Sequence, residues 1–176
     1  MGFLAIVLIL GASICSAETP DPGGTVVRAS LGLPVLTNGD LFGVDAALLV
    51  GSTGSPFRFG VQALSLTDIA LFVTPNVELN AIHCVVGYEL SRTGVFSAIV
   101  FGGAGMANWV QRGKLLSSSD WNETYEKQTG YGPSLLVGMN AGVSIYRHFG
   151  ISLTGGVMAN NGTTAFTNLQ LDAGTW

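Results

Sequence analysis

Apolar side chains alternate with small or polar ones through most of this chain, and this period of two constrains the fold more than any other feature. The clearest example is Ser134–Tyr146, where the odd positions are apolar and most even positions are small or polar. Alternate side chains of a strand point to opposite faces, whereas a helix would scatter these residues around its axis. We therefore expect an all-β fold whose strands each have one apolar face.

The alternation predicts eight strands. They are Thr25–Leu36, Leu41–Gly51, Phe57–Leu66, Val77–Leu90, Val95–Val110, Ser134–Tyr146, Ile151–Val157 and Asn168–Ala173. In the fourth strand, the polar residues Glu78 and Asn80 fall on the same face as the apolar residues of Ile82–Leu90. This suggests either a bulge in the strand or, if the strand crosses a membrane, that its first residues extend above the membrane surface. We expect Ile82–Leu90 to be the embedded part. The fifth is apolar at both parities, and because Thr93–Gln111 carries no charge, a transmembrane helix is the alternative there.

The composition narrows the class of protein. Only 10% of the 176 residues are charged, the net charge is −4, and 48% are hydrophobic, whereas soluble domains have about 25% charged residues. The mean hydropathy is +0.48. This composition excludes a disordered tail and an electrostatic nucleic-acid binder, and it favours a membrane protein that crosses with strands.

The first residues are predicted to lie outside the fold. Residues 1–17 combine an apolar run with small residues that end at Ala17, a pattern typical of a cleaved signal peptide. Residues 18–24 form a Pro/Gly-rich linker, and 25–176 form the barrel domain. Cleavage would leave Cys84 as the remaining thiol, so no intramolecular disulfide is expected.

The connections between the predicted strands differ in length on the two sides. If the N-terminus is periplasmic, the inner turns are Ser52–Pro56, Ser91–Gly94 and Arg147–Gly150, and the outer loops are Asn38–Asp40, Thr67–Asn76, Gln111–Gly132 and Asn160–Thr163. Short inner turns and longer outer loops are typical of transmembrane barrels. Because hydrocarbon cannot hydrogen-bond the backbone, such strands can cross only as a closed barrel. We predict an antiparallel, up-and-down transmembrane β-barrel of eight strands, unless the chain is a piece of a larger one.

On this pattern, 25–176 resembles the small outer-membrane barrels of the OmpA membrane-domain and OmpX type, within the porin-like superfamily. The resemblance implies residence in the outer membrane of a Gram-negative-type cell envelope, with membrane lipids and the barrel assembly machinery as partners. It also implies that the terminal aromatic residue, Trp176, is an assembly signal. Gly174 and Asp172 stand where that signal favours apolar side chains, so the match is imperfect.

Charged residues on the non-apolar strand faces predict lumenal ion pairs. Arg28 lies low on the first strand and Asp172 low on the last, and closure would make these strands neighbours. Arg58 and Glu89 are similarly placed on the third and fourth strands. Because an unpaired charge in a narrow lumen is costly, we expect the pairs Arg28–Asp172 and Arg58–Glu89, with Asp45 joining either one.

Four aromatic residues fall near predicted strand ends. Trp109 would lie near the outer rim, and Phe57, Tyr88 and Tyr146 near the periplasmic rim. Aromatic girdles at both interfaces are typical of membrane barrels, although aromatic residues are also common in ordinary strands.

The molecular activity is not encoded in a recognisable motif. We expect a structural or surface-interaction role, with Gln111–Gly132 as the contact loop and its extracellular ligand unknown. A narrow passive pore for ions or small solutes is the first alternative. A lipid-modifying enzyme is the second, since His83 is predicted to face the lumen, but no serine lies near it at a matching spacing, so we expect no enzyme. No metal site, cofactor or nucleic-acid partner is expected.

Overall fold

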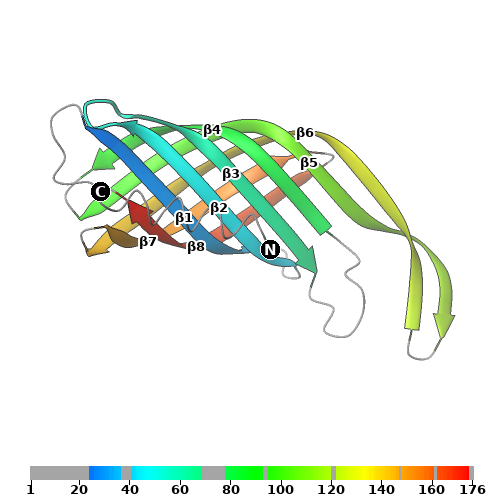
Figure 1. The fold of residues 1–176 in the computed structure, drawn as a ribbon. Helices are drawn as coiled ribbons and strands as arrows, with labels where there is room; N and C mark the ends of the chain where they lie inside the picture. The colour runs from blue at the N-terminus through cyan, green and yellow to red at the C-terminus, as the bar shows by residue number, and fades with distance from the viewer. Residues whose placement is uncertain are drawn as a thin grey trace.

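The structure is a computed structural model that describes residues 24–36, 41–68, 78–92, 95–119, 122–146, 148–160 and 162–174. In these ranges eight antiparallel strands close into a barrel, each paired with its neighbours in chain order (Figure 1). They are β1 (Thr25–Leu36), β2 (Leu41–Ser52), β3 (Phe57–Asp68), β4 (Glu78–Arg92), β5 (Phe96–Ser119), β6 (Asn122–Tyr146), β7 (Phe149–Ala159) and β8 (Thr163–Gly174). The predicted fold class, an antiparallel eight-stranded barrel, is confirmed.

Closure is made by β1 and β8, which pair in a register that places Ser30 opposite Asp172. Every strand therefore has a partner on both sides, which satisfies the backbone donors and acceptors along the barrel wall. The helical alternative for Thr93–Gln111 is wrong from Phe96 onward, because that stretch belongs to β5. In the described part of the chain, no helix is long and apolar enough to cross a membrane.

The barrel has two distinct ends. At one end, which we call the terminal end, β1 begins, β8 ends and Thr53–Pro56 connects β2 to β3 (left in Figure 1). At the opposite end, the hairpin end, β5 and β6 continue far beyond the other strands. The predicted loop Asn38–Asp40 lies outside the described residues, and so does the predicted loop Thr67–Asn76 except for Thr67 and Asp68, which belong to β3.

The prediction of a long loop at Gln111–Gly132 is wrong. Most of these residues pair with one another across the β5–β6 hairpin. The hairpin extends past its neighbours, because the pairing of β5 with β4 ends at Val110 and the pairing of β6 with β7 begins at Leu135. We call residues 111–119 and 122–132 the ribbon (Figure 1). Its sequence lacks the two-residue alternation of the other strands, but backbone pairing does not depend on side-chain polarity, so the two segments still form a hairpin.

The suggested bulge near the start of β4 is also absent. Side chains alternate between the lumen and the exterior without interruption from Leu79 to Tyr88, so Asn80 faces outward like Ile82. There Asn80 accepts a hydrogen bond of 2.7 Å from Ser65 on the neighbouring strand. The register shift of β4 lies at the other end of the strand, between Glu89 and Ser91.

Outward side chains form an apolar belt around the barrel, as the alternation predicted. The belt includes Leu33, Phe59, Val61, Ile82, Val86, Leu135, Val137, Met139, Leu153, Val157, Leu169 and Leu171, all exposed. Because a water-soluble barrel would present polar residues there, this belt is the surface expected to meet acyl chains. The inward face, in contrast, has both polar and apolar layers.

Candidate functional site

The lumen of the terminal half is filled by a polar network centred on Arg28. Its Nη2 atom lies 2.9 Å from Asp172 Oδ2 and 2.8 Å from Asn140 Oδ1, and Nη1 lies 3.3 Å from Ser97 Oγ. Ser30 donates a further hydrogen bond to Asp172 Oδ1 at 2.5 Å. Both members of the ion pair are buried, so the structure brings together the two residues that the closure argument paired.

Asn140 extends this network across the lumen, and the sequence analysis did not single it out. Its amide nitrogen lies 2.7 Å from Thr154 Oγ1, 2.9 Å from Ser152 Oγ and 3.0 Å from Gln170 Oε1. The signal that could have found it is its position, since it is the one amide among the small and apolar inward residues of β6 from Ser134 to Gly142. An amide can donate and accept at once, so one residue can connect β6 with β1, β7 and β8.

A second ion pair closes the terminal end of the lumen. Arg58 donates from Nη2 to Glu89 and from Nη1 to the backbone carbonyls of Ser52, at the end of β2, and Ser55, in the β2–β3 turn. Arg92 lies close to the same carboxylate, with Nε 4.0 Å from Glu89 Oε1. The arginine therefore fastens a turn to a neighbouring strand as well as balancing charge.

Asp45 does not join either ion pair. Its carboxylate is fully buried and accepts hydrogen bonds from three amides: Gln62 Nε2 at 2.8 and 3.0 Å, Asn168 Nδ2 at 2.6 Å and Gln170 Nε2 at 2.9 Å. The expectation that it would share an arginine is corrected by this arrangement. Buried carboxylates can be stabilised by hydrogen bonds alone when several donors converge on them.

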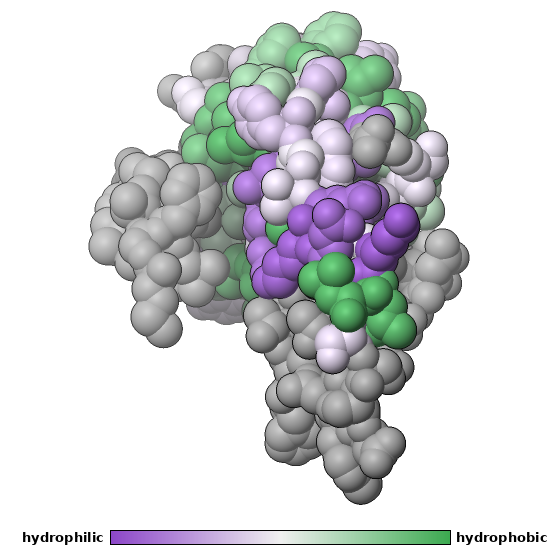
Figure 2. Space-filling model, turned by 90° about the vertical axis from the view of Figure 1, so that its right-hand side faces the viewer, coloured by the Kyte–Doolittle hydropathy of each residue, from purple (hydrophilic) through white to green (hydrophobic). Residues whose placement is uncertain are grey.

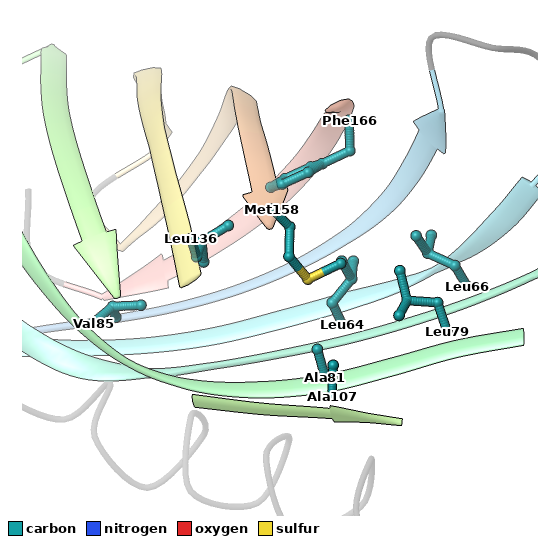
Figure 3. Close-up of a cluster of buried hydrophobic side chains, with 9 residues drawn as sticks. All are labelled: Leu64, Leu66, Leu79, Ala81, Val85, Ala107, Leu136, Met158 and Phe166. Carbon is teal, nitrogen blue, oxygen red and sulfur yellow. The ribbon is translucent and has the colours of Figure 1, made fainter. Parts of the chain in front are cut away.

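Toward the hairpin end the lumen becomes apolar, which the sequence analysis did not anticipate. A cluster of buried side chains from β3 to β8 meets across the barrel (Figure 3), and we call it the plug: Leu64, Leu66, Leu79, Ala81, Val85, Ala107, Leu136, Met158 and Phe166. Met158 is completely buried and Leu66 is 1% exposed. These apolar residues face inward and alternate with polar outward residues near the rim. The expectation of a single apolar, outward face on each strand therefore does not predict them.

Two small cavities lie in the lumen, both near the polar network. One has a volume of about 30 Å³ and is lined partly by Ser30, Gln62 and Thr154. The other has a volume of about 20 Å³, near Arg58 and Glu89. Each has room for only about a water molecule, which occupies about 30 Å³ in the liquid. With the plug on their hairpin side, these cavities do not make an open channel.

His83 has a serine partner that sequence spacing could not reveal. Its Nε2 atom lies 2.9 Å from Ser134 Oγ, which comes from β6, 51 positions away. Both residues are 1% exposed and face the lumen, away from the belt. Nδ1 of His83 has no hydrogen-bond partner in the described residues. A serine hydrogen-bonded to a histidine can act as a nucleophile, but here both side chains are buried in the lumen.

The four residues of the predicted aromatic girdle do not share one face of the barrel wall. Phe57, Tyr88 and Tyr146 are exposed on the outer face at the terminal end, and the rings of Phe57 and Tyr88 pack edge to face with centroids 5.3 Å apart. Trp109 is different, because its inward ring covers Gly130 and packs against the plug. Its assignment to the girdle is therefore wrong.

The ribbon presents polar and apolar side chains together. Lys114, Glu126, Lys127 and Gln128 are exposed, and so are Leu115 and Leu116, at 50% and 65%. Figure 2 looks onto this side of the molecule and shows hydrophilic and hydrophobic surface side by side. The predicted signal peptide 1–17 and Trp176 lie outside the described residues.

No protein-family model matches the chain, and no curated protein matches it. Solved structures do. The chain is similar to the N-terminal β-barrel domain of Pseudomonas aeruginosa OprF, with 12% identity over 88% of this chain and 99% of that one, and a TM-score of 0.55. It is also similar to Neisserial surface protein A, with 13% identity over 85% of this chain and 92% of that one, and a TM-score of 0.42. A de novo designed transmembrane β-barrel matches with 10% identity over 90% of this chain and 100% of that one, and a TM-score of 0.47.

These findings define the class of fold. The chain has the fold of a small outer-membrane β-barrel of the OmpA membrane-domain type.

Proposed function

We propose that this protein resides in the bacterial outer membrane, with its terminal end in the periplasm, and acts at the cell surface through the ribbon. The observation that carries the proposal is a paired hairpin that projects from the barrel with Leu115 and Leu116 exposed among charged residues. Exposed apolar side chains rimmed by polar ones are typical of interaction surfaces. Export through a cleaved signal peptide and insertion by the barrel assembly machinery are part of this proposal.

The filled lumen supports contact rather than conduction. A passive pore needs a continuous aqueous path, whereas the plug occupies the hairpin half and the cavities near the polar network are no larger than about 30 Å³. An eight-stranded barrel is narrow enough for its side chains to fill it. The barrel then serves as a rigid anchor for the ribbon, and a purely structural role in the envelope is the competing reading.

The test compares cells that express the full barrel, a barrel with residues 112–127 replaced by a short turn, and no barrel. Attachment of cells to one another and to protein-coated surfaces measures surface interaction, and resistance to external detergent measures envelope integrity. We expect the shortened barrel to keep detergent resistance and to lose attachment. Equal attachment by the full and shortened barrels would overturn the proposal, and a detergent effect without an attachment effect would favour the structural role.

A further inference from the structure

The apolar belt has a groove on the outer face of β4, β5 and β6, close to the terminal end. In one cross-strand row Val86, Gly102 and Val137 lie side by side, so a glycine separates two branched side chains. A Cβ atom at Gly102 would meet only the carbonyl oxygen of Leu136, at 3.7 Å. The backbone of β5 is therefore bare on the outside at this point.

Neighbouring side chains border this gap and make it an open groove. The next row toward the terminal end holds Phe57, Tyr88 and Val100, and the edge-to-face packing of Phe57 and Tyr88 makes a wall. The groove has a volume of about 430 Å³ and is open along its outer side.

We propose that this groove binds one acyl chain of a phospholipid. The groove is continuous with the belt, which is the surface expected to meet acyl chains, and its walls are almost entirely apolar. A second copy of the barrel is a poor occupant, because a two-fold interface would place the same concave surface on both partners and leave a void between them. A single flexible chain can instead fill a narrow open groove along its length.

The choice of phospholipid rests on the proposed function. With the terminal end in the periplasm, the groove lies in the inner leaflet, and the Tyr88 hydroxyl is placed at the strand end where a headgroup would lie. An aromatic ring with a polar tip is suited to that depth. The acyl chain in the groove therefore belongs to a phospholipid of the inner leaflet and not to lipopolysaccharide of the outer leaflet.

Two outward glycines allow a matched experiment. Gly102→Leu would fill the groove, whereas Gly155→Leu adds the same side chain on β7, outside the groove, where a Cβ atom would meet nothing within 4 Å. Both variants and the wild type are refolded in mild detergent, their folding is checked by heat-modifiable electrophoretic mobility, and each is mixed with phosphatidylglycerol or with lipid A. Native mass spectrometry then measures the retained lipid.

We expect the wild type and Gly155→Leu to retain one phosphatidylglycerol, and Gly102→Leu to lose the bound population by about tenfold or more, which corresponds to about 1.4 kcal/mol. Equal retention by all three proteins, or retention by none, would overturn the site. Preferential retention of lipid A would overturn the phospholipid assignment. Because the assay uses purified protein, its outcome is independent of whether the ribbon mediates attachment.

Discussion

Arg28 and Asp172 lie 144 positions apart, on the first and last strands, and their side chains meet at 2.9 Å inside the closed barrel. The pair joins the two strands whose pairing closes the sheet. It is buried in a lumen that also holds Asn140 and Ser97 as partners of the guanidinium group. The ion pair therefore links the two strands whose pairing closes the barrel.

Removing one charge of this ion pair should lower the stability of the barrel more than removing both. Asp172→Leu leaves Arg28 without its carboxylate, and breaking a buried ion pair in this way costs about 3–5 kcal/mol. The double variant Arg28→Met with Asp172→Leu leaves no unpaired charge, so we expect a smaller loss. Urea-dependent unfolding of the barrel in phospholipid vesicles measures both. A double variant that loses as much stability as Asp172→Leu or more, or an Asp172→Leu variant as stable as the wild type, would contradict the role of the pair.

The plug should prevent ion conduction. Purified wild-type barrel in a planar bilayer is expected to show no stepwise conductance. Met158→Ala together with Phe166→Ala opens space in the plug and should destabilise the barrel by about 2–5 kcal/mol for each truncation. A Leu169→Ala variant, on the outward face of β8, is the control because it leaves the plug intact. Regular conductance steps from the wild type would favour the pore.

The inward position of Trp109 can be tested by fluorescence quenching. In a Trp121→Phe, Trp176→Phe background, bromine atoms in the middle of the acyl chains should quench Trp109 only weakly, because the barrel wall separates it from lipid. A comparison variant moves the tryptophan to the belt, with Trp109→Phe and Val137→Trp, and should be quenched strongly. Similar quenching of the two proteins would place Trp109 on the outer face and restore the girdle assignment.

The buried contact of His83 with Ser134 should matter for stability and not for lipid chemistry. His83→Ala leaves the Ser134 hydroxyl unpartnered in the lumen, which costs about 1–3 kcal/mol. Mass spectra of membrane lipids from cells that express His83→Ala or the wild type are expected to be identical. A lipid species that is present with the wild type and missing with both His83→Ala and Ser134→Ala would identify a lipid-modifying enzyme.

The strands could be predicted because membrane barrels repeat one physical rule. Thr25–Leu36 matches β1 at both ends, since lipid requires an apolar outward face at every second position. Arg28 and Asp172 could be paired because closure alone makes their strands neighbours. Alternation and chain order are sufficient in both cases.

The remaining features depend on relationships that a linear pattern does not contain. Ser134 reaches His83 through the register of β4, β5 and β6, which no local spacing encodes. The girdle prediction for Trp109 uses its distance from a strand end. Whether its side chain faces lipid or the lumen depends instead on the alternation of side chains along β5, which places it inside. Asp45 meets amides because Gln62 and Asn168 point into the same layer of the lumen, and amides carry no charge to signal a partner.

Labelling on intact cells tests the central claim most directly, namely that the ribbon projects from the outer membrane and the terminal end faces the periplasm. In a Cys84→Ala background, Ser117→Cys places a thiol on the exposed ribbon and Gly54→Cys places one in the exposed β2–β3 turn. A membrane-impermeant maleimide should label Ser117→Cys on intact cells, and Gly54→Cys only after the outer membrane is permeabilised. Labelling of Gly54→Cys on intact cells, with Ser117→Cys protected, would contradict the account.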